Sequence, residues 1–391
     1  MNKKRILYYL ILLIFFPVFL YSQDFKIEHG PYLQAVGENE VTLVWTTNKD
    51  AVSWVEIAPA GDDSFYSEAR PAVYQTQFGN RTVGYLHKVR IRNLTINTEY
   101  RYRVFSKEIQ TYEGKRIIYG KIVATDVFRK KPLRFKTLGS TQDKVHFSMV
   151  CDVHGHIDTL KALLQNVKYR ETDLVFFNGD MVSTVESEKQ FFEGFMQPAI
   201  DMFASEVPMF YVRGNHETRG KFSMDFPQYF PTTTGNLYYS FRQGSVFFIV
   251  LDGGEDKPDS DIEYSDLAQF DNYRTEQAQW LEKTVQSEDC KNAEYRIVIN
   301  HIPPFGTDWH GAQDIKKKFL PILNNANISV MLCGHMHIYE YIEPKAGEHN
   351  FPIYINAANS VLDIDVNSQE IVINRKNTKG RILDTNKLKQ Q

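Results

Sequence analysis

Residues 145–154 read Val-His-Phe-Ser-Met-Val-Cys-Asp-Val-His, and this stretch determines how the second part of the chain is interpreted. Its first seven residues form a nearly continuous apolar run, which is typical of a strand buried on both faces of a sheet. Residues 173–180, Asp-Leu-Val-Phe-Phe-Asn-Gly-Asp, have the same arrangement. The sequence therefore predicts buried strands that end in polar side chains.

The residues that follow alternate between strand and helix patterns. Helical spacing appears in residues 159–167, 186–204 and 275–285, and apolar strands are predicted at 208–212, 246–251, 296–300, 328–333 and 352–355. Buried strands separated by helices indicate an α/β domain. We place this domain at residues 144–391, after a polar linker.

Polar clusters stand at the carboxyl ends of five predicted strands, where open α/β sheets place their active sites. The clusters are Asp152-Val153-His154, Gly179-Asp180, Gly214-Asn215-His216-Glu217, Asn300-His301 and Gly334-His335-Met336-His337. In an extended chain, residues i and i+2 face the same way. We therefore expect Asp152 with His154, and His335 with His337, each to point two ligands into one pocket.

These clusters contain enough ligating groups for two metal ions. The candidate ligands are two carboxylates, four imidazoles and one amide oxygen, from Asp152, Asp180, His154, His301, His335, His337 and Asn215. Imidazole suits Zn, Fe and Mn, and oxygen ligands suit the harder members of that set. If Asp180 bridges, each ion has four protein ligands. We expect two ions, whose identity the sequence leaves open, and a positively charged pocket that attracts phosphate.

Residues 24–138 follow a different pattern, in which apolar and polar residues alternate with a period of two. Such alternation, in segments such as 41–46 and 89–92, predicts half-buried strands separated by Gly, Asp and Asn turns. Residues 94–100 end in Tyr100 and lead into another strand, which is typical of the tyrosine corner of a β-sandwich. An all-β sandwich is therefore predicted before the α/β domain.

Both parts resemble known families. The N-terminal part resembles the fibronectin type III-like domain of purple acid phosphatases, in Gly30-Pro31-Tyr32-Leu33-Gln34, the Val-Trp-Thr strand at 44–46, the strand at 87–94 and the closing residues 133–137. In the second part, the order DxH, GD, GNHE, H and GHxH is similar to that of calcineurin-like metallophosphoesterases.

The second resemblance implies a four-layer α/β/β/α sandwich with a dinuclear metal centre. One metal is expected at Asp152, His154, Asp180 and His337, and the other at Asp180, Asn215, His301 and His335. His216 is expected to contact the phosphate and to assist the transition state or the leaving group, with Glu217 as a possible orienting partner. The implied reaction is in-line attack of a metal-bound hydroxide on phosphorus.

One departure from the purple enzymes concerns the metal site. Those enzymes pair a DxG motif with GDxxY, whose tyrosine binds ferric iron and gives the colour. Here the corresponding positions hold His154 and Ser183. The metal site therefore follows the general phosphoesterase family, and we expect no tyrosinate-bound iron.

Several other residues have open interpretations. His310, in a predicted loop at 302–311, is a candidate second proton donor because purple acid phosphatases have a similarly placed loop histidine, and the alternative is an exposed residue without a role. We expect His87 and His349 to be ordinary surface or edge residues. Cys151 and Cys333 lie on predicted buried strands, and the sequence does not decide between two free thiols and a disulfide.

The first 22 residues have the pattern of a secretory signal peptide. Basic residues at 3–5 precede an apolar run at 6–20, and the small residue Ser22 follows. The alternative, a retained anchor, is disfavoured because the run is shorter than the ~20 residues that span a membrane. We therefore expect a periplasmic or secreted protein that begins near Gln23.

Composition excludes several classes of protein. A hydrophobic fraction of 42% and a charged fraction of 24% are ordinary for a globular protein and exclude disordered and multi-span membrane classes. A net charge of −3 gives no indication of a nucleic acid partner. We expect contact with a membrane only through the signal peptide, and the sequence does not indicate an oligomeric state.

Together these features predict an exported phosphoesterase that acts on phosphate esters. A phosphomonoesterase similar to acid phosphatases is the first interpretation, and a phosphodiesterase or nucleotidase of the same family is the alternative. A catalytically dead scaffold would show gaps in the ligand set, and the sequence shows none. A cell-surface binding protein would show exposed aromatic or calcium-loop patterns, and none is clear.

Overall fold

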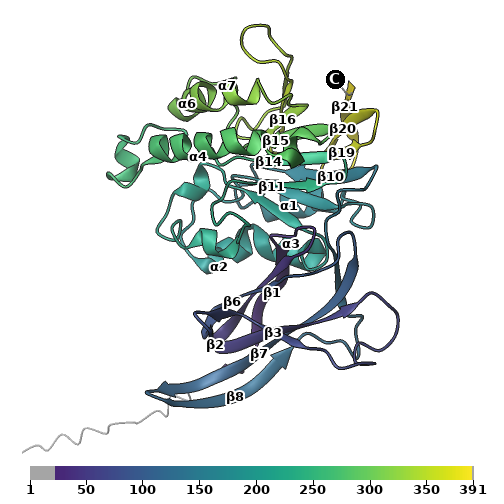
Figure 1. Ribbon diagram of the computed structural model, residues 1–391. Coiled ribbons are helices and arrows are strands. Elements are labelled where there is room, and N and C mark those ends of the chain that lie inside the picture. Colours follow the sequence, from purple (N-terminus) through teal and green to yellow (C-terminus); the bar gives the residue numbers. More distant parts are fainter. Residues whose placement is uncertain (1–22, 390–391) are drawn as a thin grey trace, which may run out of the picture.

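The computed structural model describes residues 23–389, so the predicted signal peptide at 1–22 lies outside the described residues. Figure 1 shows an N-terminal part made of strands and a C-terminal part in which helices cover sheets. None of the helices in residues 23–389 has both the length and the apolar character that a membrane span requires. The predicted order of an all-β domain followed by an α/β domain is confirmed.

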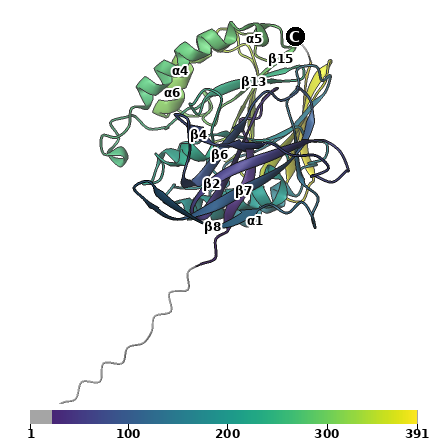
Figure 2. The ribbon, with the colours of Figure 1, turned by 60° about the horizontal axis from the view of Figure 1, so that its bottom comes forward.

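The N-terminal part is built on a seven-stranded sheet, whose long strand β2 (Val41–Pro59) pairs with four of the other strands. The first part of β2 pairs with β1 (Ile27–Gln34) and β6 (Gly84–Ile91), and the second part pairs with β7 (Glu99–Glu113) and β3 (Ala72–Tyr74). The remaining strands are β8 (Arg116–Ala124) and β9 (Leu133–Lys136), which pair with β7, and the small ladder β4 (Thr76–Gln77) with β5 (Asn80–Arg81). Figure 2 shows β2 and β7 running across this part.

The predicted tyrosine corner is present at the start of β7. The Tyr100 hydroxyl accepts a hydrogen bond from the backbone N–H of Thr95 at 2.8 Å. This contact ties the turn before β7 to the strand itself. The next inward-facing tyrosine, Tyr102, is fully buried, as the alternation of the sequence predicts.

The C-terminal part contains two six-stranded sheets. The first has the order β12 (Met209–Val212), β11 (Leu174–Asn178), β10 (Val145–Val150), β19 (Ser360–Val366), β20 (Glu370–Asn377) and β21 (Ile382–Lys389). The second has the order β13 (Tyr239–Gln243), β14 (Val246–Val250), β15 (Tyr295–Ile299), β16 (Val330–Cys333), β18 (Ile353–Ile355) and β17 (Glu340–Ile342). The strands that carry the predicted motifs pair in parallel within each sheet: β10 with β11, β11 with β12, and β15 with β16.

Helices cover the outer face of each sheet. The first sheet packs on α1 (Ile157–Leu164) and on a helical run formed by α2 (Glu188–Phe191), η1 (Phe192–Met196), α3 (Gln197–Ala199) and η2 (Ile200–Ala204). The second packs on α4 (Phe270–Val285), α5 (Glu288–Lys291), α6 (His310–Lys318) and α7 (Leu320–Leu323). Figure 2 shows α4, α5 and α6 together on one outer side. With a further core between the sheets, the four-layer sandwich is confirmed.

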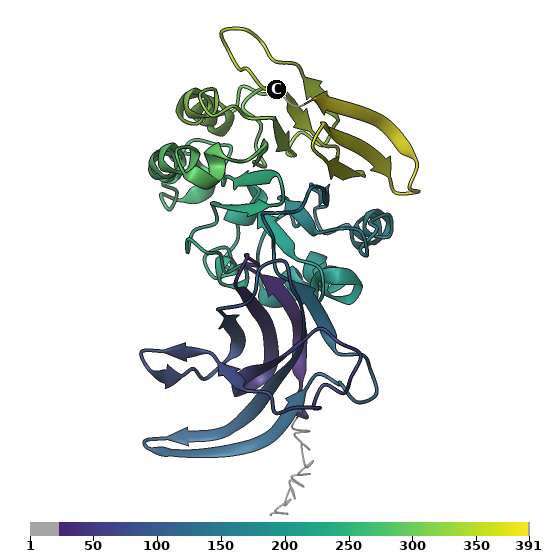
Figure 3. The same ribbon diagram turned by 45° about the vertical axis from the view of Figure 1, so that its right-hand side comes forward.

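Two local features differ from the expected pattern. The helix expected at 186–204 contains two wide π-helical segments, η1 and η2, and Pro198, which has no backbone N–H to donate, lies between them. The strands β19 to β21 at the C-terminus were not predicted, although they complete the first sheet. Figure 3 shows them in yellow, at the end of the molecule remote from the N-terminal part.

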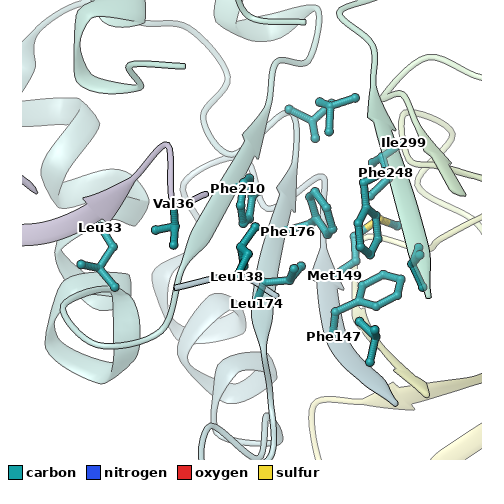
Figure 4. Packing of buried hydrophobic residues seen from close by; sticks show 14 of the residues in the cluster. Leu33, Val36, Leu138, Phe147, Met149, Leu174, Phe176, Phe210, Phe248 and Ile299 are labelled. Atoms are coloured by element: carbon teal, nitrogen blue, oxygen red, sulfur yellow. The ribbon is translucent and has the colours of Figure 1, made fainter. Parts of the chain in front are cut away.

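The N-terminal part packs directly against the first α/β sheet. The hydroxyl of Tyr32 donates to the carbonyl of Tyr229 at 2.9 Å, and Gln34 Nε2 donates to the carbonyl of Met209 at 3.1 Å. Leu33 and Val36 belong to the same hydrophobic cluster as residues between the two α/β sheets. Figure 4 shows Val36 between Leu33 and Phe210 of β12.

Two histidines that we expected at the surface are buried instead. His87 is 3% exposed because it faces the ring of Trp45, and its Nε2 lies 2.8 Å from Thr47 Oγ1. Burial lowers the pKa of His87 to about 3. His349 is also 3% exposed and packs beside the ring of Phe305. Two cysteines that the sequence left undecided, Cys151 and Cys333, are free and buried.

The remaining helical turns are short 3₁₀ segments. They are η3 (His216–Thr218), η4 (Phe226–Tyr229) and η5 (Ile262–Tyr264). The first of them, η3, follows β12 and carries part of the GNHE motif into the site described next.

Candidate metal centre

The structure brings all seven predicted ligands together at the carboxyl ends of the parallel strands. Asp152 and His154 follow β10, Asp180 follows β11, and Asn215 follows β12. His301 follows β15 of the second sheet, and His335 and His337 follow β16. Residues from both sheets therefore meet at one edge of the sandwich, as expected for α/β sheets.

The backbone at the site is strained. Five of the seven predicted ligands have a positive φ, which few residues other than glycine adopt: 55° at Asp152, 49° at His154, 53° at Asp180, 73° at His335 and 60° at His337. The expectation that these pairs lie in extended chain was therefore wrong. The chain turns sharply after each strand, and this turn, not strand alternation, points both side chains of a pair inward. Such strain clusters at functional sites.

A first group of donor atoms belongs to Asp152, His154, Asp180 and His337, and these atoms lie within 4.8 Å of one another. His154 Nε2 and His337 Nε2 are 3.1 Å apart. His154 Nε2 is 3.8 Å from Asp180 Oδ2, and His337 Nε2 is 3.6 Å from Asp152 Oδ1. The two carboxylates and two imidazoles thus face a common point.

A second group contains Asp180, His301 and His335, again within 4.8 Å. His301 Nε2 is 3.2 Å from Asp180 Oδ2. The amide oxygen of Asn215 lies 3.0 Å from His335 Nδ1, which adds this residue to the group. Asp180 is common to both groups.

The chemistry of His301 fits a metal ligand. Its Nδ1 lies 2.7 Å from the carbonyl oxygen of Asn178 and donates its hydrogen there, so Nε2 is the nitrogen that can lose its proton and offer a lone pair to a cation. This Nε2 is buried and has no hydrogen-bond partner among the described residues. A buried imidazole with one nitrogen anchored and the other free is the usual arrangement of a metal-binding histidine.

The charges at the site are also suited to a cation. Burial raises the pKa of Asp152 to about 6. Although burial alone lowers the pKa of His301, the carboxylates of Asp180 and Asp152 raise it to about 10. Burial lowers the pKa of His335 to about 3, so this imidazole is neutral and able to ligate. The positive charge of protonated His301 therefore offsets the negative charges of the two carboxylates, and a bound cation is able to replace that proton.

Ser183 contacts two of the candidate functional histidines. Its carbonyl accepts a hydrogen bond from His216 Nδ1 at 2.7 Å, and its Oγ lies 3.5 Å from His154 Nδ1. Both rings therefore turn their Nε2 atoms toward the site, and His216 Nε2 is 3.9 Å from Asp180 Oδ2. His216 thus lies beside the predicted ligands.

Glu217 does not orient His216, and that hypothesis was wrong. Its buried carboxylate accepts four backbone hydrogen bonds, at 2.9 Å from Asp180, 2.6 Å from Met181, 3.4 Å from Val182 and 3.0 Å from Gly214. The carboxylate therefore holds the turn that contains Asp180 against the turn that contains Asn215. The reason is geometric, because the 3₁₀ turn η3 directs residue 217 back beneath the site.

His310 is placed differently from the expectation. It is not in a loop but is the first residue of α6, and its Nε2 lies 2.7 Å from Asp271 Oδ1 on α4. Among the described residues it makes no hydrogen bond to a predicted ligand. The role of His310 as a second proton donor stays a prediction, and the contact with Asp271 does not support it.

The sequence analysis missed an acidic cluster after β14, in Asp252-Gly253-Gly254-Glu255-Asp256. Glu255 binds Arg219 at 2.8 Å and accepts from Thr218 Oγ1 at 2.8 Å, which fixes the end of η3. Asp256 Oδ2 lies 3.9 Å from His335 Nε2. The signal was available, since polar residues directly follow a predicted buried strand here too.

Known protein families match both parts of the chain. The family model of calcineurin-like phosphoesterases matches residues 148–339, and that of the purple acid phosphatase N-terminal domain matches residues 29–115. The chain is 25% identical to purple acid phosphatase 22 of Arabidopsis thaliana over 66% of its own length and 54% of that protein. It is 22% identical to purple acid phosphatase 21 of the same plant, over 83% of the chain and 69% of the relative.

A solved structure shows the same fold. Purple acid phosphatase PPD1 from yellow lupin seeds superposes with a TM-score of 0.66 and 16% identity, covering 92% of this chain and 74% of that one. The chain spans only about half the length of purple acid phosphatase 22, so likeness is restricted to the shared parts. Residues 148–339 therefore form a calcineurin-like phosphoesterase domain, and residues 29–115 form the purple acid phosphatase N-terminal domain that precedes it.

Proposed function

We propose that the protein is an exported phosphatase that hydrolyses phosphate monoesters at a two-metal centre. The observation that carries the proposal is that Asp180 belongs to both groups of donor atoms. A carboxylate with two oxygens can hold two cations close together, which is the geometry that phosphoryl transfer uses. The proposal of export comes from residues 1–22 of the sequence alone.

The residues have separate roles in this proposal. Asp152, His154 and His337 hold one cation, Asn215, His301 and His335 hold the other, and Asp180 holds both. When bound, two such cations supply Lewis-acid stabilisation of the phosphoryl oxygens and an activated water. The chain keeps the ligands fixed, since Asn178 anchors His301 and Glu217 anchors the turn at Asp180.

His216 is the proposed proton carrier. Its Nδ1 hydrogen is engaged by the carbonyl of Ser183, so only Nε2 is free to exchange a proton in the site. The side chain is 27% exposed, which leaves it accessible to a substrate entering from solvent. From this position Nε2 is able to donate a hydrogen bond to the phosphate or a proton to the leaving oxygen.

The test combines metal analysis with a substrate panel. We expect about two metal ions per chain in the wild type, and hydrolysis of alkyl and aryl monoesters that exceeds hydrolysis of the matching diesters. Asp180→Ala is expected to lose both metal binding and turnover, whereas Asp201→Ala, a change at an exposed carboxylate on η2, is expected to alter neither.

Two outcomes would contradict the proposal. Faster turnover of diesters or nucleotides would favour the alternative function of a phosphodiesterase or nucleotidase. Full activity of a metal-characterised Asp180→Ala protein would remove the two-metal centre altogether.

A further inference from the structure

A cavity of about 440 Å³ opens beside His154 and is called here the His154 cavity. Three segments line it: the turn after β10, the segment after β11, and the helical run α2 and η1. Its residues are His154, Gly155, Ile157, Val182, Ser183, Ser187, Lys189, Gln190, Glu193 and Gly194. The volume lies within the range of small-molecule sites, roughly 300–1,000 Å³. The cavity therefore adjoins the candidate metal centre and has room for a small organic group.

The wall formed by η1 is held close to the turn after β11. A Cβ on Gly194 would lie 2.7 Å from Val182 Cγ1, so only glycine permits this approach. Ser187 and Gln190 use their polar atoms to build the same wall. Ser187 Oγ accepts from the backbone N–H of Gln190, and the Gln190 amide bonds the backbone of Thr184 and Glu186. These hydrogen bonds and the close contact at Gly194 therefore fix the position of the wall. In addition, π-helical segments such as η1 are frequent at functional sites.

The polar groups left for a ligand are a hydroxyl and two opposite charges. Ser183 Oγ adjoins the candidate metal centre, 3.5 Å from His154 Nδ1. Lys189 Nζ and the Glu193 carboxylate are 3.8 Å apart, with side chains 80% and 66% exposed, so both are free to reorient toward a ligand. Apart from the imidazole of His154, the lining contains no aromatic ring on which a nucleobase or phenyl group would stack.

We propose that the His154 cavity holds the alcohol part of the substrate ester, and that this part is small, polar and non-aromatic, such as a polyol or an amino alcohol. The inference rests on the proposed phosphoesterase function and adds its substrate class. The phosphate lies at the metal centre, and hydroxyl or ammonium groups of the alcohol bond to Ser183, Lys189 and Glu193. The partly exposed apolar side chain of Ile157 packs against its carbon chain.

The test narrows the cavity without touching the metal ligands. Glu193→Trp and Lys189→Trp place a large ring at its mouth, and Lys168→Trp is the matched control, because Lys168 forms a similarly exposed ion pair with Glu171 outside the cavity. The substrates are glycerol 1-phosphate, phosphoethanolamine, 4-nitrophenyl phosphate and methyl phosphate, with inorganic phosphate as inhibitor.

We expect the two cavity variants to raise KM for glycerol 1-phosphate and phosphoethanolamine by roughly tenfold. KM for methyl phosphate and inhibition by inorganic phosphate should stay unchanged, and so should all constants of the control. A uniform change for every substrate, or none for glycerol 1-phosphate, overturns the inference. The inference is also overturned if the wild type has a higher kcat/KM for 4-nitrophenyl phosphate than for the other esters and the cavity variants keep that preference. If the metal-loaded wild type hydrolyses none of the esters, the proposed function itself fails.

Discussion

Replacing Glu217 by glutamine should destabilise the protein without removing any ligand or proton carrier. In the structure Oε1 accepts from Met181 and Val182, and Oε2 accepts from Asp180 and Gly214. A glutamine side chain keeps one oxygen, which can accept two of the four bonds. Its NH₂ group replaces the other oxygen and faces the remaining two backbone N–H donors. A buried donor without a partner costs about 1–3 kcal/mol, and one of the four bonds is long, so we expect a loss of about 2–4 kcal/mol. That is a large fraction of a typical stability of about 5–15 kcal/mol.

Urea unfolding of the metal-free protein, followed by circular dichroism, measures this loss. The experiment belongs at pH 8, because burial raises the pKa of Glu217 to about 7 and the carboxylate is ionised only above that value. Glu171→Gln is the control, since Glu171 is 68% exposed and should be neutral. Calorimetric titration should also show weaker metal binding, because the turn at Asp180 is no longer held. A change below about 0.5 kcal/mol together with a fall in kcat would refute the reasoning and restore a direct action of Glu217 on His216.

Four further predictions concern the site. His216→Ala should keep its metals and lose roughly 10²–10⁴ in rate, the usual worth of a positioned proton donor; loss of metal on analysis would make it a ligand instead. Ser183→Ala should weaken metal binding roughly tenfold in calorimetry because His154 loses its anchor, with Ser183→Thr restoring it; equal affinities would dismiss that contact. His310→Ala should leave the ratio of alkyl to nitrophenyl phosphate turnover unchanged, because its Nε2 is engaged by Asp271; a selective loss on the alkyl ester would reinstate it as a donor. In the metal-free protein, His301 has a pKa of about 10 in the folded state and 6.5 in the unfolded chain. Because only the folded state holds this proton between pH 6.5 and 10, the melting temperature should fall as the pH rises through that range. A melting temperature that stays constant over that range would mean that no such proton is held.

The sequence predicted that the candidate ligands lie together because each follows an apolar run. Parallel strands align their carboxyl ends, so polar residues at the end of separate strands meet without further information. The backbone conformation was not predictable in the same way. Nothing in Asp-Val-His distinguishes an extended segment from a turn with positive φ at both ends, which only the packing of neighbouring turns imposes.

The role of Glu217 and the placement of His310 were missed for a similar reason. Neighbourhood in sequence suggested that Glu217 acts on His216, but a 3₁₀ turn sends adjacent side chains in different directions. His310 was assigned to a loop at 302–311, yet helix α6 begins at that residue. The partners that decide both positions, the turn at Asp180 and Asp271 of α4, are distant in the sequence.

The contacts between the N-terminal sheet and β12 have a consequence for how such proteins evolve. Strand β12 leads directly into Asn215 and His216. At the start of the strand, Gln34 donates a hydrogen bond to the carbonyl of Met209, and Phe210 packs beside Val36. The N-terminal sheet thus contributes to the hydrophobic core beneath the candidate metal centre and is not a separate domain on a flexible linker. A lineage that lost or exchanged this sheet would expose apolar side chains such as Phe210 to water. We therefore expect the two parts to be inherited as a single unit. Substitutions on one side of the contact with β12 should be compensated by substitutions on the other side.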